Sequence, residues 1–134
     1  MNGVLHKLFH MKSRLDRSVF RAIILARAYS RADDSTDVSA RHLFRGAIAA
    51  HYRSLFSLSP PTIRHLRGRK DIWTPDSKRS LARAGRHAAR RGGSAITIRD
   101  LLLALRETDT TAVDADLASL GVDPKHFFSR ILSQ

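Results

Sequence analysis

Histidines are the residues of this chain best suited to metal binding, and the sequence contains seven of them. His6 and His10 are four residues apart, so a helix would place both rings on one face within reach of a single ion. No glutamate sits between them in the metalloprotease arrangement, and no third ligand is nearby. An adventitious ion is the most that such a pair would hold. We therefore predict no metal site and no cofactor.

Nucleophilic catalysis needs a nucleophile, a base and a third group that orients the base. The sequence has no cysteine, and none of its serines stands in a Gly-x-Ser-x-Gly nucleophile elbow. Acidic residues gather at 33–37 and 107–116 without an acid–base pattern on a rigid face. A phosphate loop of the form Gly-x-x-x-x-Gly-Lys-Ser/Thr is also absent from the sequence. We predict that the chain is not an enzyme.

Arginines recur at helical spacing in the second half of the sequence. On a helix at about 100° per residue they share an arc of roughly 60°, opposite a narrow stripe of small side chains between Ser77 and Ala88. Such a face is either a solvated surface, a track for phosphates, or a surface that meets an acidic protein. We call these residues the basic face: Arg79, Arg83, Arg86 and Arg90.

The bulk composition is that of a basic globular chain. Twenty-four Lys and Arg against 12 Asp and Glu give a net charge of +12, and 43% of the 134 residues are hydrophobic. A field of this sign attracts nucleic acid, acidic proteins and anionic surfaces alike. No apolar run approaches the roughly 20 residues of a membrane span. With the lack of cysteine, this favours a cytoplasmic location.

Helical periodicity and end signals recur along the chain, and no alternation typical of strands competes with them. Thr74, Pro75 and Asp76 form a helix start, and Gly92 with Gly93 forms a stop. The predicted domain plan is a lead-in at 1–14 and a double repeat over 15–134, with repeat one at 15–66, a linker at 67–72 and repeat two at 73–133. Besides a short lead-in helix at 4–9, we expect helices at 16–30, 39–51, 52–58, 62–66, 76–90, 98–106, 111–120 and 124–133.

The two halves share one plan of a capped helix, a break, a β-branched residue and a short apolar helix. Residues 15–47 align without a gap on the stretch 58 residues later, although only four of the 33 aligned positions are identical. The shared plan, rather than the identity, indicates a duplicated unit. The predicted fold class is all-α, with two four-helix repeats related by a pseudo-twofold axis.

The second repeat resembles the N-terminal domain of Clp ATPases, which is built from two Clp repeats. The residues that carry the resemblance run from Trp73-Thr74-Pro75 through Ile96-Thr97 and the apolar stretch 101–105 to Leu120-Gly121-Val122-Asp123. It covers about residues 15–133 and is distinctive in the second repeat. The resemblance implies an eight-helix bundle that docks substrates, adaptors or phosphoarginine-tagged proteins. With no phosphate loop, and with a lead-in at Met1, we expect a stand-alone domain that lacks the ATPase modules; the alternative is a fragment of a longer Clp ATPase.

The chain departs from the family at the positions that read phosphoarginine. Where the family commonly has a glutamate before the short apolar helix, this chain has Arg41 and Arg99. The threonine near each repeat start is Asp16 in the first repeat and Thr74 in the second. Because a guanidinium repels a guanidinium, we predict that phosphoarginine is not recognised in the family's manner. By the same resemblance, His42 is expected to satisfy a backbone group rather than to catalyse.

The resemblance and the charge pattern together favour a non-catalytic protein-interaction module. We expect it to bind Clp ATPase or protease subunits, their adaptors or their clients, through a groove between the halves near Arg41, Trp73, Thr74 and Arg99. Trp73, the single tryptophan, is expected to pack between the halves. The alternative is a nucleic-acid-binding protein that uses the basic face without sequence specificity. No residue set for reading base edges accompanies that face, and aromatic residues are too few for stacking on single strands.

Overall fold

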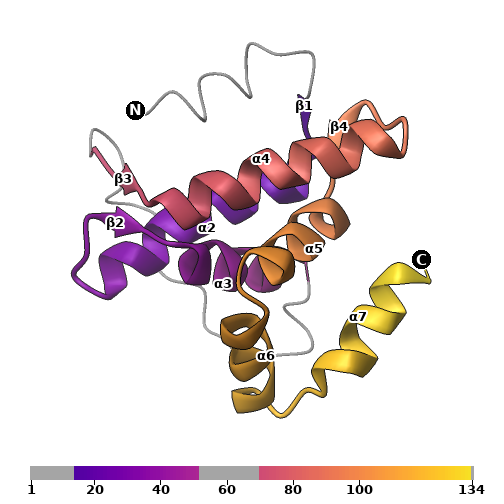
Figure 1. Ribbon diagram of the computed structural model, residues 1–134. Coiled ribbons are helices and arrows are strands. Elements are labelled where there is room, and N and C mark those ends of the chain that lie inside the picture. The colour runs from indigo at the N-terminus through magenta and orange to yellow at the C-terminus, as the bar shows by residue number, and fades with distance from the viewer. Residues whose placement is uncertain (1–13, 52–69, 134) are drawn as a thin grey trace.

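A computed structural model describes residues 14–51 and 70–133. These parts of the chain are mostly helical and contain six helices and four two-residue strands (Figure 1). The helices are α2 (Arg17–Ala32), α3 (Ala40–His51), α4 (Pro75–Arg90), α5 (Ile98–Thr108), α6 (Thr110–Ser119) and α7 (Pro124–Leu132). The strands are β1 (Arg14–Leu15), β2 (Asp37–Val38), β3 (Ile72–Trp73) and β4 (Ala95–Ile96). The helices expected at 4–9, 52–58 and 62–66 lie outside the described residues, so the eight-helix count stays a prediction.

The end signals of the sequence act where they were expected. The Thr74 side chain caps α4 by accepting the Ser77 N–H at 3.4 Å, and Pro75 is the first helical residue. At the other end of α4, Gly92 takes a φ of +71°, a left-handed conformation that glycine adopts without strain. Gly93 N–H then returns to the carbonyl of Ala88 at 2.9 Å, which closes the helix end.

The strands hold the two halves together, and the sequence analysis missed them. β1 pairs in parallel with β4, and β2 pairs in parallel with β3, so each half supplies one strand to each pair. The prediction of a helical fold is confirmed in its coarser form, because these parts of the chain are mostly helical, but it did not include these four short strands. Two residues are too few to show the alternation by which a strand is recognised in a sequence.

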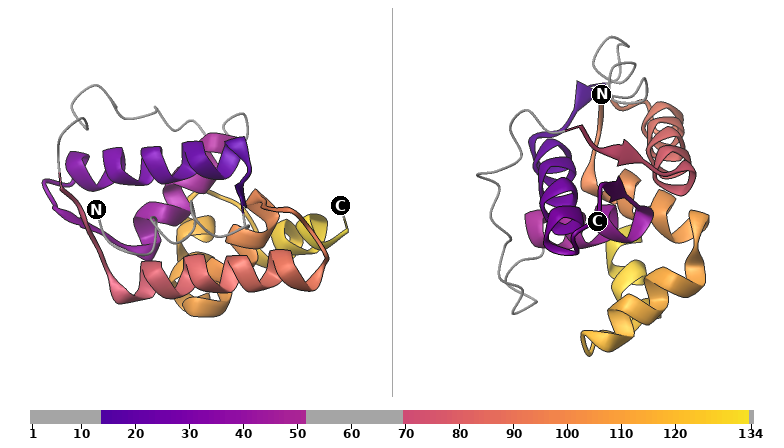
Figure 2. Two further views of the ribbon diagram at one scale, coloured as in Figure 1. Left: turned by 90° about the horizontal axis from the view of Figure 1, so that it is seen from above. Right: turned by 90° about the vertical axis from the view of Figure 1, so that its left-hand side faces the viewer.

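Element bounds repeat at the predicted offset. α2 begins at Arg17 and α4 begins 58 residues later at Pro75, and β1 and β2 recur at the same offset as β3 and β4. Exchange of strands places the start of α2 beside the end of α4, so the two long helices run antiparallel (Figure 2). The repeat boundaries themselves stay a prediction, because residues 52–69 are not described.

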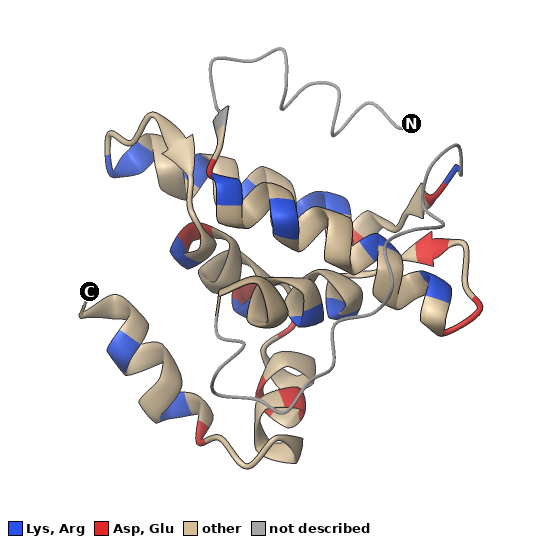
Figure 3. Ribbon diagram, turned by 180° about the vertical axis from the view of Figure 1, so that it is seen from behind, with Lys and Arg blue, Asp and Glu red and all other residues tan. Residues whose placement is uncertain are grey.

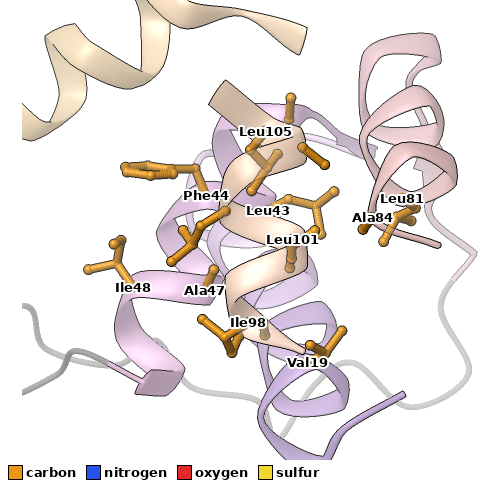
Figure 4. Packing of buried hydrophobic residues seen from close by; sticks show 14 of the residues in the cluster. Val19, Leu43, Phe44, Ala47, Ile48, Leu81, Ala84, Ile98, Leu101 and Leu105 are labelled. Atoms are coloured by element: carbon orange, nitrogen blue, oxygen red, sulfur yellow. The ribbon is translucent and has the colours of Figure 1, made fainter. Parts of the chain in front are cut away.

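The core lies between α2, α3, α4 and α5, and α6 and α7 add buried residues to it. Leu101 and Leu105 of α5 are fully buried and face Leu43 of α3, while Leu81 and Ala84 point in from α4 (Figure 4). This is the narrow small-residue stripe of α4 that the periodicity predicted, and it faces inward. In the described part of the chain, no helix is both long enough and apolar enough to span a membrane.

Candidate functional site

Arg41 lies at the start of α3 and is held by α6. Its Nη2 is 2.8 Å from Asp116 Oδ1 and its Nε is 3.3 Å from Asp116 Oδ2, which is a two-point contact of guanidinium and carboxylate. The hydrogen bond to Asp116 raises the pKa of Arg41 above its ordinary value. The Arg41 side chain stays 59% exposed, so the pair can be reached from solvent.

Two adjoining cavities open beside this ion pair, and both are lined by Arg41, Phe44 and Asp116. One, of about 150 Å³, lies between α3, α5 and α6, with Leu105 and Val113 on its wall. The other, of about 250 Å³, extends along α3 and includes Tyr29, Arg45 and Leu120. We call the two together the Arg41 groove.

Charge in the Arg41 groove differs from that of the whole chain. The smaller cavity is lined by three carboxylates, from Asp76, Asp109 and Asp116, against the single guanidinium of Arg41. α6, which forms one wall, contains acidic residues and no Lys or Arg (Figure 3). The smaller cavity therefore combines an apolar floor with an acidic rim, on a protein of net charge +12, whereas the larger cavity has Arg41 and Arg45 against Asp116.

Thr74 and Trp73 lie next to the groove, in structural roles. Thr74 Oγ1 hydrogen-bonds the Asp76 carboxylate, and the same carboxylate accepts the N–H of Ala40 at 3.4 Å. These contacts join the start of α4 to the start of α3. Trp73 is only 3% exposed, and its backbone pairs with that of Val38. Its ring is therefore part of the packing between the halves and is not presented to a partner.

Arg99 does not lie with the other three predicted contact residues. It is at the start of α5, directly after β4, whereas Trp73 and Thr74 lie at the start of α4. α4 connects these two ends, and its 16 residues span about 24 Å at 1.5 Å per residue. The structure thus gathers Arg41, Trp73 and Thr74 at one end of the molecule and places Arg99 toward the other.

Three of the four arginines of the basic face are exposed, and Arg83 is half-buried. Arg79, Arg86 and Arg90 have no ion pair recorded within residues 14–51 and 70–133, and Arg83 lies 4.0 Å from Glu107. A second contact to Glu107 comes from His87, whose Nε2 is 2.7 Å from Glu107 Oε1. Sequence reasoning found the arginines and missed Glu107 and His87, because Glu107 comes from α5 and no local pattern joins it to α4.

Ser39, His42 and Asp33 make a chain of hydrogen bonds that resembles a hydrolase triad. His42 Nδ1 lies 3.0 Å from Ser39 Oγ, and His42 Nε2 lies 2.9 Å from Asp33 Oδ2. However, Nδ1 also accepts the backbone N–H of Ser39 at 3.0 Å, so its lone pair is already used and Nε2 carries the proton. Ser39 Oγ in turn accepts the backbone N–H of His42 at 3.4 Å. Each of the two side chains thus accepts the backbone N–H of the other residue, which is a reciprocal helix cap.

The second half supports this reading of the cluster as a cap. The positions 58 residues later are Thr97, Asp100 and Arg91, and they make equivalent contacts, with the Asp100 carboxylate in place of the imidazole and the Arg91 guanidinium in place of the Asp33 carboxylate. Asp100 Oδ2 accepts the Thr97 N–H at 2.9 Å and lies 2.7 Å from Arg91 Nη2. Both oxygens of Asp100 are already used by Arg91 and Thr97, so the role that the two clusters share is to cap a helix and tie it to the preceding one.

Metal binding is not indicated in the described part of the chain. No group of three or more His, Cys, Asp or Glu side chains there is placed to hold an ion. His6 and His10, the pair considered from the sequence, lie outside the described residues.

Comparison with known proteins shows the fold of the chain. No protein-family model and no curated protein sequence matches it. Among solved structures, it is similar to the N-terminal domain of the caseinolytic protease associated chaperone ClpD from Arabidopsis thaliana, with a TM-score of 0.71 and 16% sequence identity. The match covers 90% of this chain and 96% of that one. The chain therefore has the fold of a Clp N-terminal domain.

Proposed function

We propose that this chain, with its Clp N-terminal domain fold, is a non-catalytic protein-interaction module of a Clp chaperone–protease system. Its partners would be Clp ATPase or protease subunits, their adaptors or their client proteins, and its binding would modulate regulated proteolysis in the cytoplasm. The likeness to the ClpD N-terminal domain over nearly the full length of both chains is the observation that carries the proposal. Function does not follow from a fold alone, so the site must supply the rest.

The Arg41 groove is the surface that we propose for this contact. Its floor is formed by the nearly buried side chains of Phe44 and Val113, and Leu120 on the wall of the larger cavity is 38% exposed, with charged groups around them. Protein interfaces combine an apolar centre with a polar rim in the same way. The Arg41–Asp116 pair crosses the junction of the two cavities, so a bound segment would contact it directly.

Replacing Arg41 with glutamate is expected to weaken binding to a purified Clp subunit of the same organism by about tenfold or more. The variant places a carboxylate beside Asp116 and removes the cation that a partner would meet. Biolayer interferometry with immobilised ATPase, protease and adaptor proteins measures the effect. Arg130→Glu is the matched control, because it makes the same charge change at an exposed position on α7 and should leave affinity within about twofold.

A charge-exchanged variant separates recognition from stability. Arg41→Asp combined with Asp116→Arg keeps an ion pair at the same place, so its melting temperature should stay near that of the wild type. Its affinity for the Clp subunit should still fall. The proposal is wrong if the wild-type chain binds none of the Clp proteins at micromolar concentration. It is also wrong if the Arg41→Glu and Arg130→Glu variants bind a Clp protein equally well.

Non-specific nucleic-acid binding is the second candidate, favoured by the exposed arginines of the basic face. A titration with duplex DNA at about 50 mM and about 200 mM salt tests it, because each phosphate contact steepens the dependence of log affinity on log salt by close to one unit. We expect weak binding that disappears at the higher salt, for the wild type and for Arg41→Glu alike. Binding that persists at the higher salt would favour the nucleic-acid function instead.

A further inference from the structure

A cavity of about 280 Å³ lies between the second half of α4 and the end of α5, and every side chain that lines it is ionisable. Three guanidiniums, from Arg83, Arg86 and Arg90, surround it together with His87 and Glu107. The four α4 residues are spaced so that they share one helix face. We call this cavity the cationic pocket.

One carboxylate already occupies part of the cationic pocket. Glu107 Oε1 is 2.7 Å from His87 Nε2 and 4.0 Å from Arg83 Nη1, whereas Arg86 and Arg90 are exposed and have no ion pair recorded in the described part of the chain. The pocket thus holds an excess of positive charge after Glu107 is counted. The position of Glu107 also shows that a carboxylate fits against the imidazole of His87.

The first half shows that the fold does not require these charges. The positions 58 residues before Arg83, His87 and Glu107 are Leu25, Tyr29 and Ala49, which are 4%, 9% and 2% exposed. There they form a small apolar cluster on the equivalent helix pair. The same helix pairing therefore forms with a buried apolar cluster in one half and a charged set in the other. Packing of the two helices does not require the charged set, so its side chains are available for recognition.

We propose that the cationic pocket binds an acidic segment of a partner protein, whose side-chain carboxylates displace Glu107 and engage Arg86 and Arg90. This deepens the proposed function and rests on it in taking the partner to be a protein. Guanidiniums bind carboxylates and phosphates in the same two-point geometry, so the surroundings of the pocket decide between them. Glu107 lines the pocket and Asp109 follows it between α5 and α6, and both carboxylates would repel a continuous polyanion laid across the pocket. A short acidic peptide avoids them.

The test is the binding of fluorescein-labelled hexaglutamate to the full chain, measured by fluorescence anisotropy at moderate salt. Arg86→Ala combined with Arg90→Ala should weaken binding by about tenfold or more. Lys125→Ala combined with Arg130→Ala is the matched control, because it removes two exposed positive charges from α7, and it should change affinity by less than about threefold. Glu107→Gln should strengthen binding by about threefold or more, because the resident carboxylate no longer competes.

Three outcomes would overturn this inference. Equal losses in the two double variants would mean diffuse attraction, and an unchanged affinity of Glu107→Gln would mean that no displacement occurs. Tighter binding of labelled hexathymidylate than of hexaglutamate, lost with Arg86 and Arg90, would assign the pocket to nucleic acid. Binding to the Clp subunits is assayed separately. If the chain binds a Clp subunit but not hexaglutamate, only the proposal for the cationic pocket is wrong. If it binds hexaglutamate but no Clp subunit, only the proposed Clp partners are wrong.

Discussion

Replacing Gly46 with alanine is expected to lower the free energy of unfolding by about 3 kcal/mol or more, enough to unfold a marginally stable domain. A Cβ at this position would lie 2.3 Å from the carbonyl oxygen of Ala22 and 2.9 Å from the backbone nitrogen of Ala26. Both atoms belong to the backbone of α2, which cannot turn away as a side chain can. The two helices of the first half must therefore separate to admit one methyl group.

Gly85→Ala is the matched control and should change stability in the opposite direction. It lies inside α4, and a Cβ there meets only Ile96 Cδ1, at an ordinary contact distance of 3.8 Å. Alanine is favoured over glycine inside a helix by about 0.5–1 kcal/mol, and we expect a gain of that order. Urea unfolding followed by circular dichroism measures both variants. Wild-type stability of Gly46→Ala would contradict the close packing of α2 on α3.

The opposite stability changes expected for the Gly46→Ala and Gly85→Ala variants could not be predicted from the sequence. Both residues lie inside predicted helices, and nothing local distinguishes them. What separates them is the distance to a neighbouring helix, which depends on the packing of residues far apart in the chain. The offset of 58 residues aligns Gly46 with Ala104, so even the internal repeat gives no warning that the first half needs a glycine there.

Helix positions were predictable because their signals are local. Thr74 and Gly92 each define a helix end through contacts within a few residues, and both act in the structure as expected. Pairing of β2 with β3 depends on residues more than 30 positions apart. A strand of two residues has no recognisable pattern in the sequence, so the pairing between the two halves is known only from the structure.

The candidate sites show the same difference between local signals and contacts of residues far apart in the chain. The arginines of the basic face are spaced along one helix, so periodicity found them. The partners that turn charged residues into sites come from other elements: Asp116 of α6 for Arg41, and Glu107 of α5 for His87. Arg41 stands where the family commonly has a glutamate, but Asp116 pairs with it, and the smaller cavity beside the pair is acidic. Recognition of phosphoarginine is still predicted to fail, because Arg41 remains charged.

Asp100→Asn is expected to cost about 2–3 kcal/mol of stability at neutral pH. The Asp100 residue is 2% exposed, and its carboxylate accepts the Thr97 N–H at 2.9 Å and two contacts from Arg91 at 2.7 and 3.0 Å. An amide presents one acceptor where the carboxylate has two, and it carries no charge. Asp123→Asn is the control: Asp123 is the exposed N-cap of α7, where asparagine serves about as well, so the change should be below about 0.5 kcal/mol.

The cost of Asp100→Asn should depend on pH in a defined direction. Burial raises the pKa of the Asp100 carboxyl, but the hydrogen bonds from Arg91 and Thr97 outweigh burial and hold this pKa below its ordinary value of 3.8. As the pH falls, the unfolded chain therefore binds this proton before the folded chain does, and protonation favours unfolding. The stability contributed by the carboxylate is present in full above about pH 5 and is lost as the pH falls through the folded-state pKa.

Urea unfolding of the wild type and Asp100→Asn at steps from about pH 7 to about pH 3 checks this, because the difference between the two isolates Asp100 from the other titrating carboxylates. The difference in unfolding free energy should be constant down to about pH 5 and should shrink below it. A difference that is small at neutral pH and grows in acid would mean that burial of Asp100, rather than its contacts with Arg91 and Thr97, decides its protonation. The cap that joins α4 to α5 would then destabilise the second half instead of stabilising it.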